Sequence, residues 1–290
     1  MLRRSECVLV AYFVYCSAVA AVRPVIPAVR AVTLLFNLYL VASYAVVAYA
    51  GRRRKSVTLE VARDWLPLFL LLLAYREMGW FALPHTGHPL EQAWVVWDRM
   101  ALRGGARAAI ECLGPFLPSL LEISYSLVYA LGPFAVAMLY CYRRRERADA
   151  FLLGLSLGVL LCYVQFPLWP SEPPRTVFPG EDFPSYDTVF RRFNWWLLGG
   201  YGMHTSVFPS AHVAGAFSAA LGMRRAMPEH AWVWRVLLGM AALIGTATVY
   251  GRYHYLADAV AGLLMALVAA ALASWLSTYP RKEPLPKAEP

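Results

Sequence analysis

The stretch YLADAVAGLLMALVAAALASWL, residues 255–276, contains one charged side chain, Asp258, in an otherwise apolar run. A helix needs about 20 mainly apolar residues to cross the roughly 30 Å of hydrocarbon in a bilayer. The run has that length, and it lacks the alternation of polar and apolar residues that is typical of a membrane-barrel strand. It therefore predicts a transmembrane helix.

Runs of the same kind occur along the whole chain. Of the 290 residues, 59% are hydrophobic and 16% are charged, whereas soluble domains contain about 45–50% apolar and about 25% charged residues. We therefore expect an all-α polytopic membrane bundle. The first run follows Arg3 and Arg4 and also fits a cleaved signal peptide, but we expect it to remain as a transmembrane helix. The eight candidate spans are residues 5–22, 31–50, 65–83, 120–142, 149–169, 207–225, 232–250 and 255–276.

Basic residues cluster between the apolar runs, at Gly51–Lys55, Arg143–Arg147 and Met223–Met227. Short cytoplasmic loops of membrane proteins carry such an excess of Lys and Arg. The net charge of +9 is then explained by topology in the plasma (inner) membrane, and we expect no nucleic-acid partner. If all three clusters are cytoplasmic, both termini are cytoplasmic too, and the outer side receives residues 23–30, 84–118, 170–206 and 251–255.

Three further segments have a predicted place relative to the membrane. Residues 84–118 carry Trp94 and Trp97, which favour the headgroup layer, so we expect a helix that lies along the interface. The aromatic residues of FNWW, 193–196, are expected to be interface anchors. Residues 277–290 are rich in proline and charge and predict a disordered cytoplasmic tail.

Two histidines far apart in the sequence fall at the same membrane level in this topology. His212 begins the span that contains FPSAH, and His254 lies in the turn GRYHYLAD before the last span. Asp258 follows His254 by four residues, so on a helix the carboxylate and the imidazole share one face. A carboxylate on one ring nitrogen orients the imidazole and makes the other nitrogen more basic, as a nucleophile requires. Each histidine by itself also fits an interfacial residue bonded to a neighbour.

Groups that bind anions accompany the histidines. Ser210 and Ala211 begin a helix whose free backbone N–H groups form an anion site. Arg252 lies two residues before His254, and Arg175 ends the rigid run PSEPPR in the neighbouring outer loop. Together these residues predict a phosphate site at the outer face of the membrane.

The motifs FPSAH and YHYLADAVAG resemble the second and third motifs of the type-2 phosphatidic acid phosphatase and haloperoxidase superfamily, usually written Pro-Ser-Gly-His and Ser-Arg-x5-His-x3-Asp. PPR and the His-Tyr pair are more similar to the branch that contains inositol phosphorylceramide synthases and related bacterial membrane proteins. The resemblance covers roughly residues 60–276. It implies a six-helix phosphatase-like domain at 61–276, preceded by a transmembrane helix pair at 1–60.

The resemblance also implies a mechanism without a metal ion or cofactor. His254 would attack phosphorus to form a phosphohistidine, Asp258 would orient it, and His212 would protonate the departing oxygen. The residues expected to bind the phosphate oxygens are Arg175, Ser210, Ala211 and Arg252.

Two family arginines are displaced in this chain. The first family motif, Lys-x6-Arg-Pro, is absent, because Arg23 and Pro24 have Cys16 at the lysine position and lie outside the expected region. We therefore assign its role to Arg175. The arginine of the third motif would fall at Thr248, so Arg252 would act from a different place.

Three charged residues inside predicted spans remain. Arg76 and Glu77 point about 100° apart on a helix and cannot simply pair with each other. They either pair with other helices or line a polar headgroup pocket. Glu122 is either an interfacial carboxylate or a member of that pocket, where it would hold an acceptor hydroxyl or an arginine.

The leading hypothesis is thus an integral-membrane lipid phosphatase or phosphotransferase that acts on a membrane lipid phosphate. Water or an alcohol can accept the phosphoryl group, and transfer of a headgroup phosphate to a lipid hydroxyl is the second hypothesis. A non-catalytic lipid-phosphate binder or transporter is the third. A vanadium haloperoxidase is disfavoured, because those relatives are soluble.

Overall fold

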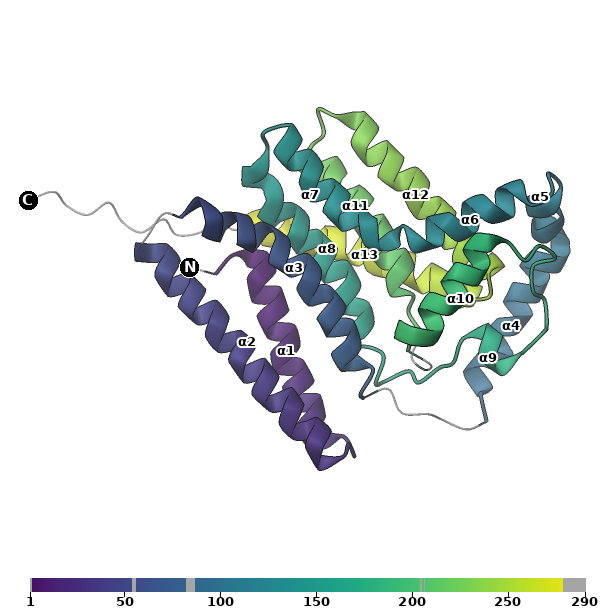
Figure 1. Ribbon diagram of the computed structural model, residues 1–290, viewed down its shortest axis with the longest axis horizontal. Coiled ribbons are helices and arrows are strands. Elements are labelled where there is room, and N and C mark those ends of the chain that lie inside the picture. Colours follow the sequence, from purple (N-terminus) through teal and green to yellow (C-terminus); the bar gives the residue numbers. More distant parts are fainter. Residues whose placement is uncertain (1, 54–55, 82–86, 204, 206, 279–290) are drawn as a thin grey trace, which may run out of the picture.

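The computed structural model describes residues 2–53, 56–81, 87–203, 205 and 207–278. Within these ranges all regular elements are helical, which confirms the all-α prediction (Figure 1). The α-helices are α1 (Arg4–Val22), α2 (Pro27–Arg53), α3 (Val57–Met78), α4 (Pro89–Ala101), α5 (Arg107–Glu111), α6 (Phe116–Ser126), α7 (Val128–Cys141), α8 (Ala148–Tyr163), α9 (Pro174–Val177), α10 (Val189–Tyr201), α11 (Ala211–Ala226), α12 (Ala231–Tyr250) and α13 (Leu256–Thr278). A π-helical turn η1 (Leu102–Ala106) and a 3-10 turn η2 (Arg145–Arg147) complete the set.

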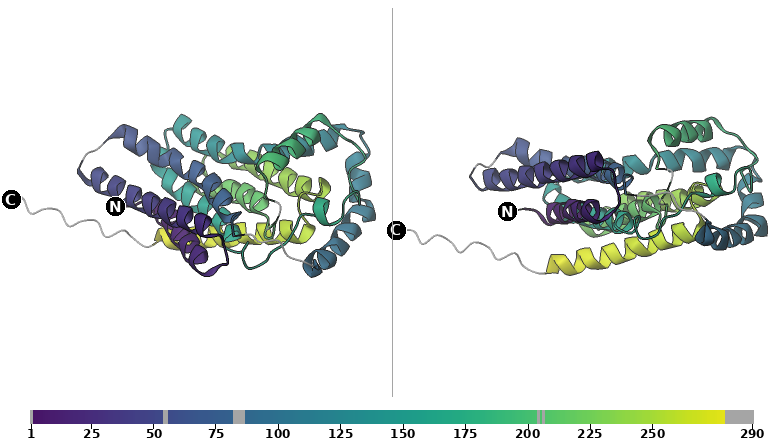
Figure 2. Two further views of the ribbon diagram at one scale, coloured as in Figure 1. Left: turned by 60° about the horizontal axis from the view of Figure 1, so that its bottom comes forward. Right: turned by 90° about the horizontal axis from the view of Figure 1, so that it is seen from below.

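Helix α8 forms the centre of the bundle because it is apolar on all sides and is buried along almost its whole length. Helices α1, α3, α11 and α13 pack around it. Gly158 permits the close approach of α11, since a Cβ atom there would lie 1.9 Å from Oγ of Ser218. The helix pair α1 and α2 lies on one side of the molecule and α4 on the other (Figures 1 and 2).

Four of the described helices, α1, α2, α12 and α13, have the length and composition of membrane spans, and the bent pair α6 and α7 would be a fifth. These helices indicate a membrane protein. Helices α8 and α11 have 16 residues each, fewer than the roughly 20 that a full crossing needs. The count of eight spans therefore stays a prediction.

The span predicted at 120–142 is two helices rather than one. Helices α6 and α7 are bent by 65° relative to each other, and Leu127 lies at the break. Pro133 in α7 has no N–H group, and its ring clashes with the carbonyl four residues earlier. The hydroxyl of Ser124 donates to a carbonyl of the preceding turn at 2.7 Å and so favours a bend. Ser124 thus weakens the turn just before the break, and Pro133 weakens the turn that begins at Tyr129, just after it.

A partly buried ion network joins the start of α1 to the rest of the bundle. Arg63 binds both carboxylate oxygens of Glu6, at 2.6 and 2.7 Å. Arg3 and Arg145 both bind Asp64, at 2.5 and 2.7 Å. Because Arg145 belongs to one of the basic clusters, that cluster lies at the same end of the bundle as the first helix turn. We call this set, Arg3, Glu6, Glu60, Arg63, Asp64 and Arg145, the ion network.

The segment predicted to lie along the interface, 84–118, contains α4, η1, α5 and the first residues of α6 in its described part. Residues 84–86 of that segment lie outside the described residues. The same holds for residues 279–290 of the predicted tail, whereas Ser277 and Thr278 complete α13.

Candidate active site

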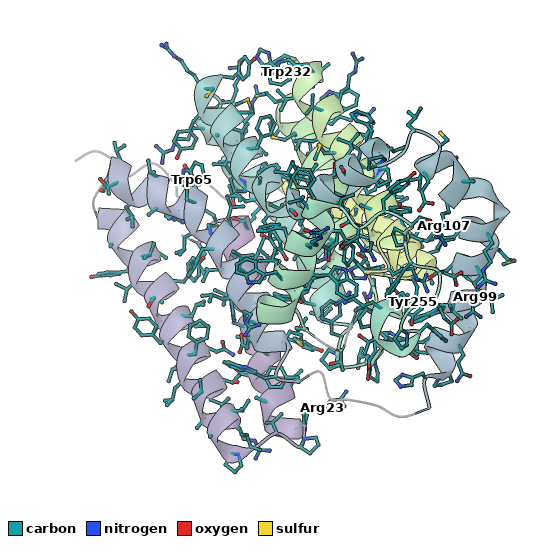
Figure 3. The ribbon with its side chains drawn as sticks, turned by 45° about the vertical axis from the view of Figure 1, so that its right-hand side comes forward. Arg23, Trp65, Arg99, Arg107, Trp232 and Tyr255 are labelled. Atoms are coloured by element: carbon teal, nitrogen blue, oxygen red, sulfur yellow. The ribbon has the colours of Figure 1, made fainter. Side chains whose placement is uncertain are left out.

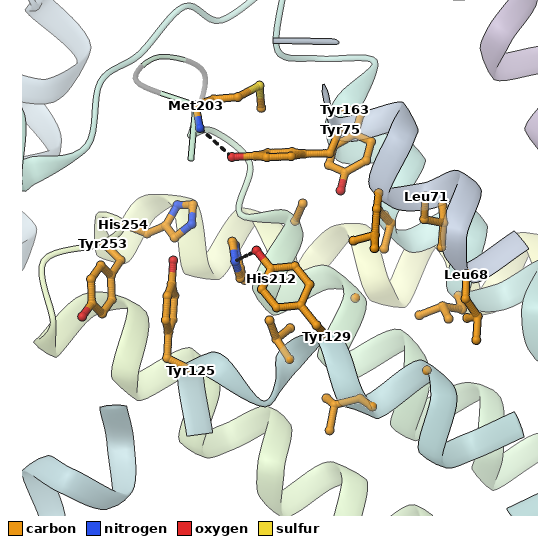
Figure 4. Close-up of a pocket in the computed structure, with 18 of the residues that line it drawn as sticks. Leu68, Leu71, Tyr75, Tyr125, Tyr129, Tyr163, Met203, His212, Tyr253 and His254 are labelled. Carbon is orange, nitrogen blue, oxygen red and sulfur yellow. Dashed lines mark hydrogen bonds between the residues drawn. The ribbon is translucent and has the colours of Figure 1, made fainter. Parts of the chain in front are cut away.

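His212 and His254 line one cavity of about 380 Å³ in the middle of the bundle (Figure 4). The two histidines lie near one end of it, while Leu68 and Leu71 lie toward the other. The polar members of the lining include His212, His254, Arg175, Tyr75, Tyr125, Tyr129 and Tyr253. The apolar members include Trp65, Leu68, Phe69, Leu72, Pro133, Leu155 and Val159. The cavity therefore has a polar part and an apolar part.

His254 lies in the turn between α12 and α13, where Asp258 on the first turn of α13 reaches it. The Nδ1 atom of His254 is 3.3 Å from Oδ2 of Asp258, and the same oxygen accepts the N–H of Tyr255 at 2.9 Å. Burial lowers the pKa of His254 to about 3. The imidazole is then neutral at pH 7, which is the form that can attack phosphorus.

His212 lies on the first turn of α11, and two tyrosines fix its ring. The ring of Tyr125 stacks on it at 4.9 Å and 16°, and the hydroxyl of Tyr129 lies 3.5 Å from its Nε2 atom (Figure 4). The rings of His212 and His254 are 5.5 Å apart. Both imidazoles can therefore reach one phosphate group placed in the cavity.

Arg175 belongs to the short helix α9 and also lines the cavity. Its Nη1 atom donates to the carbonyl of Tyr253 at 3.3 Å, and its guanidinium lies 5.9 Å from the centre of the Tyr253 ring. Among the described residues, no ion pair includes Arg175. Its charge is thus available to an anion in the cavity, beside both histidines.

Two of the residues expected to bind phosphate do not line this cavity. The hydroxyl of Ser210 caps α11 by accepting the N–H of Val213 at 3.4 Å, and its side chain is fully buried. Arg252 is also fully buried and binds Asp98. Ser210 caps its own helix and Arg252 forms an ion pair with Asp98, so their roles in phosphate binding stay predictions. Ala211, in contrast, does line the cavity.

Arg76, Glu77 and Glu122, which were predicted to form a headgroup pocket, do not line this cavity either. Glu77 is buried and accepts the side-chain amide of Asn37 at 2.7 Å. Glu122 is buried and holds an arginine, Arg191, at 3.1 Å. Carboxylates inside an apolar bundle are stable only with donors, and here neighbouring helices and loops supply the donors behind the cavity wall.

The tyrosines of the cavity were missed in the sequence. Tyr125 and Tyr129 are four residues apart, a spacing that places two side chains on one face of a helix. Tyr125 belongs to α6 and Tyr129 to α7, and both rings contact His212. Tyr253 is the neighbour of His254; its ring stacks on Tyr125 at 4.1 Å, and its hydroxyl donates to Glu122 at 2.5 Å. The spacing in SYSLVY was a usable signal, although tyrosine is equally common at membrane interfaces.

Comparison with known proteins adds a family to this geometry. Residues 110–272 match the PAP2 superfamily. A PA-phosphatase related-family protein of Dictyostelium discoideum is 25% identical over 178 residues, which are 52% of this chain and 31% of that protein. The chain thus corresponds to less than a third of the relative's length. No solved structure gives a significant match.

The family match contains Arg175, His212, His254 and Asp258. Because it extends over more than half of the chain, the chain belongs to the PAP2 superfamily.

Proposed function

We propose that the chain is an integral-membrane enzyme that cleaves a lipid phosphate ester through a phosphohistidine intermediate. The observation that carries the proposal is the composition of the cavity, which has His212, His254 and Arg175 at one end and mainly aliphatic and aromatic side chains elsewhere. A phosphate group fits the polar end, and an alkyl chain fits the apolar remainder.

In the first step the nitrogen of His254 that is not bound to Asp258 attacks phosphorus, and the ester P–O bond breaks. His212 gives its proton to the departing oxygen, which leaves as an alcohol. Asp258 keeps the Nδ1 proton of His254 in place and stabilises the positive charge of the phosphohistidine. Arg175 and the backbone N–H groups at Ala211 neutralise the phosphoryl oxygens, which is where most of the catalysis of phosphoryl transfer resides.

In the second step water or an alcohol attacks phosphorus, the P–N bond breaks, and His212 takes the proton of the attacking hydroxyl. Water gives inorganic phosphate, and an alcohol gives a new phosphate ester. Transfer to an alcohol, as in the inositol phosphorylceramide synthase branch, is supported by the tyrosine hydroxyls on the cavity wall. Tyr75 accepts the N–H of Met203 at 2.9 Å (Figure 4), so its own hydroxyl hydrogen can bind an acceptor.

We further propose that residues 61–276 form the catalytic membrane domain, after a transmembrane helix pair at 1–60 and before a cytoplasmic tail at 277–290. Both termini would lie in the cytoplasm and the site on the outer side of the plasma membrane. In support, His212 lies on the first turn of α11, and Arg224 and Arg225 lie on its last turn, roughly 18 Å away at the usual helical rise.

Reporter fusions after Lys55, at Gly180 and at the C-terminus test this orientation. We expect a cytoplasmic signal at the first and third positions and an external signal at Gly180. An external signal after Lys55 contradicts the orientation.

The chemical proposal is tested with a panel of lipid phosphates labelled at phosphorus. We expect the wild type to form a labelled phosphoprotein that is stable in alkali and lost in acid, and His254→Ala to form none and to lack turnover. His230→Ala is the matched control, because His230 contacts Tyr142 and does not line the cavity.

Each outcome of this assay decides one question. Undiminished turnover in His254→Ala refutes the phosphohistidine. Release of inorganic phosphate identifies hydrolysis, and a labelled diester formed with an added polyol or lipid alcohol identifies transfer. Tight binding of vanadate without any turnover identifies a non-catalytic binder.

A further inference from the structure

We propose that helix α4, which precedes the family-matched residues 110–272, completes the active site. Two buried carboxylates on it, Glu91 and Asp98, act as positioning residues for the segments that carry Arg175 and His254. The inference rests on the proposed function of those two residues. It gives a role in the reaction to a part of the chain that the family match leaves out.

Asp98 holds the turn of His254 from both sides. Its Oδ1 atom accepts the backbone N–H of Leu256 at 2.7 Å, and its other oxygen binds the guanidinium of Arg252. Leu256 lies two residues after His254 and Arg252 two residues before it. Arg252 has a φ of 62°, a left-handed conformation that non-glycine residues rarely adopt. One carboxylate thus stabilises a strained turn with the proposed nucleophile at its centre.

Glu91 holds the loop of Arg175 in the same way. Its Oε1 atom accepts the backbone N–H of Glu172 at 2.9 Å. Pro173 and Pro174 follow, and their fixed φ angles transmit that position to Arg175 with little freedom. The carboxylate of Glu91 is fully buried, as is that of Asp98.

The two carboxylates are seven residues apart, about two helical turns, and so share one face of α4. Between them Trp94 stacks on Phe208 of FPSAH at 4.8 Å and contacts Tyr255 at 5.7 Å. Figure 3 labels Tyr255 and, on the same side of the molecule in that view, Arg99 of α4. Helix α4 therefore contacts all three segments that supply proposed catalytic groups, and its rigid spacing sets the distance between the arginine and the nucleophile.

Kinetics of purified variants with a soluble aryl phosphate and a lipid phosphate test the proposal. We expect Asp98→Asn to lower kcat about 10- to 100-fold with little change in KM, because a small misplacement of a reacting group costs about that much. Glu91→Met removes the acceptor for Glu172, and we expect mainly a raised KM, since Arg175 binds the phosphate. A loss of folded protein would lower the apparent kcat without changing KM, so kcat is measured per folded molecule; a raised KM in Glu91→Met is not explained by loss of folding.

Two further variants separate positioning from folding. The double variant Asp98→Asn with Arg252→Gln keeps a hydrogen bond without the buried charges, and we expect it to recover most of the kcat lost in Asp98→Asn. Asp187→Asn is the matched control, because Asp187 and its partner Arg192 are 67% and 68% exposed; we expect no change.

Hydrogen exchange of the peptide that covers residues 251–258 provides a readout that does not depend on turnover. We expect faster exchange in Asp98→Asn than in the wild type. Wild-type kinetics together with wild-type exchange overturn the proposal, and so does a loss of kcat in which exchange of this turn is unchanged. If the wild type itself lacks turnover, the proposed function fails, and the exchange measurement alone decides the contact.

Discussion

Two charged regions of this apolar protein, the ion network and the cavity, differ in whether their charges are paired. In the ion network every carboxylate has a guanidinium partner, such as Arg63 on Glu6 at 2.6 Å and Arg3 on Asp64 at 2.5 Å. In the cavity Arg175 has no carboxylate partner among the described residues, and two histidines face each other beside it. Charges that are paired with each other hold helices together, whereas a positive charge without a carboxylate partner can bind an anion.

Loss of His212 should produce the largest change in the cavity. We expect His212→Gln to lower kcat on alkyl phosphates by about 10²- to 10⁴-fold, the range for removal of a general acid. With p-nitrophenyl phosphate the loss should be much smaller, because that leaving group departs without a proton. Steady-state kinetics with both substrates measure this, and His230→Gln is the control. An equal loss on the two substrates contradicts the acid role.

Loss of Arg63 should produce the largest change in the ion network. Arg63→Leu leaves the fully buried carboxylate of Glu6 without its guanidinium, and removal of one partner of a buried pair costs about 3–5 kcal/mol of stability. Thermal unfolding in detergent should show the loss, while kcat per folded molecule stays at the wild-type value. Glu146→Gln, on a side chain that is 63% exposed, is the control. A fall in kcat per folded molecule would show that the ion network also affects catalysis in the cavity.

A third change weakens the anion site without removing its charge. Arg175→Lys keeps the positive charge and loses the planar fork that binds two oxygens. We expect KM for the phosphate ester to rise by about 10- to 100-fold, as for loss of hydrogen bonds to a charged group worth ~1.5–3 kcal/mol. Arg192→Lys, at an exposed ion pair with Asp187, should leave KM unchanged. An unchanged KM for Arg175→Lys would contradict the proposed role of Arg175 in binding phosphate.

A smaller effect is expected where α13 touches the start of α11. A Cβ atom on Gly262 would lie 2.4 Å from the carbonyl oxygen of Ser210. Gly262→Ala should therefore separate Asp258 from His212 and cost about 1–3 kcal/mol of stability, seen as a lower unfolding temperature with reduced kcat. Gly239→Ala has no atom within 4 Å of its added Cβ and should not destabilise. A wild-type kcat in Gly262→Ala would show that the contact is not needed.

The smallest effect is expected at Glu77, a charged residue outside both regions. Glu77→Gln retains a hydrogen-bonding side chain beside Asn37, and we expect kcat and KM to stay within about twofold because distant sites act independently. Turnover of the preferred lipid phosphate measures this. A tenfold change in kcat or KM would support the predicted role of Glu77 in a headgroup pocket.

Local spacing explains which parts of the candidate site could be predicted. Two features could be seen in the sequence because they are local. They are the separation of four residues between His254 and Asp258, and the Pro-Ser pair before His212 at the start of α11. Arg175 was expected from its place in the adjacent loop. Asp98 and Glu91 were not, because a single carboxylate on an amphipathic helix looks like a solvated residue until its partners, 158 and 81 residues away, are known.

The sequence by itself determined that the chain is a helical membrane protein, since apolar length is a local property. Its motif spacing also predicted that two histidines and an aspartate lie together. Tertiary structure alone decided that α6 and α7 are separate helices, that Arg252 pairs with Asp98, and that Glu122 lies behind the cavity wall. A buried charge takes whichever partner packing brings within hydrogen-bonding distance. That choice depends on contacts between distant segments, which no local pattern records.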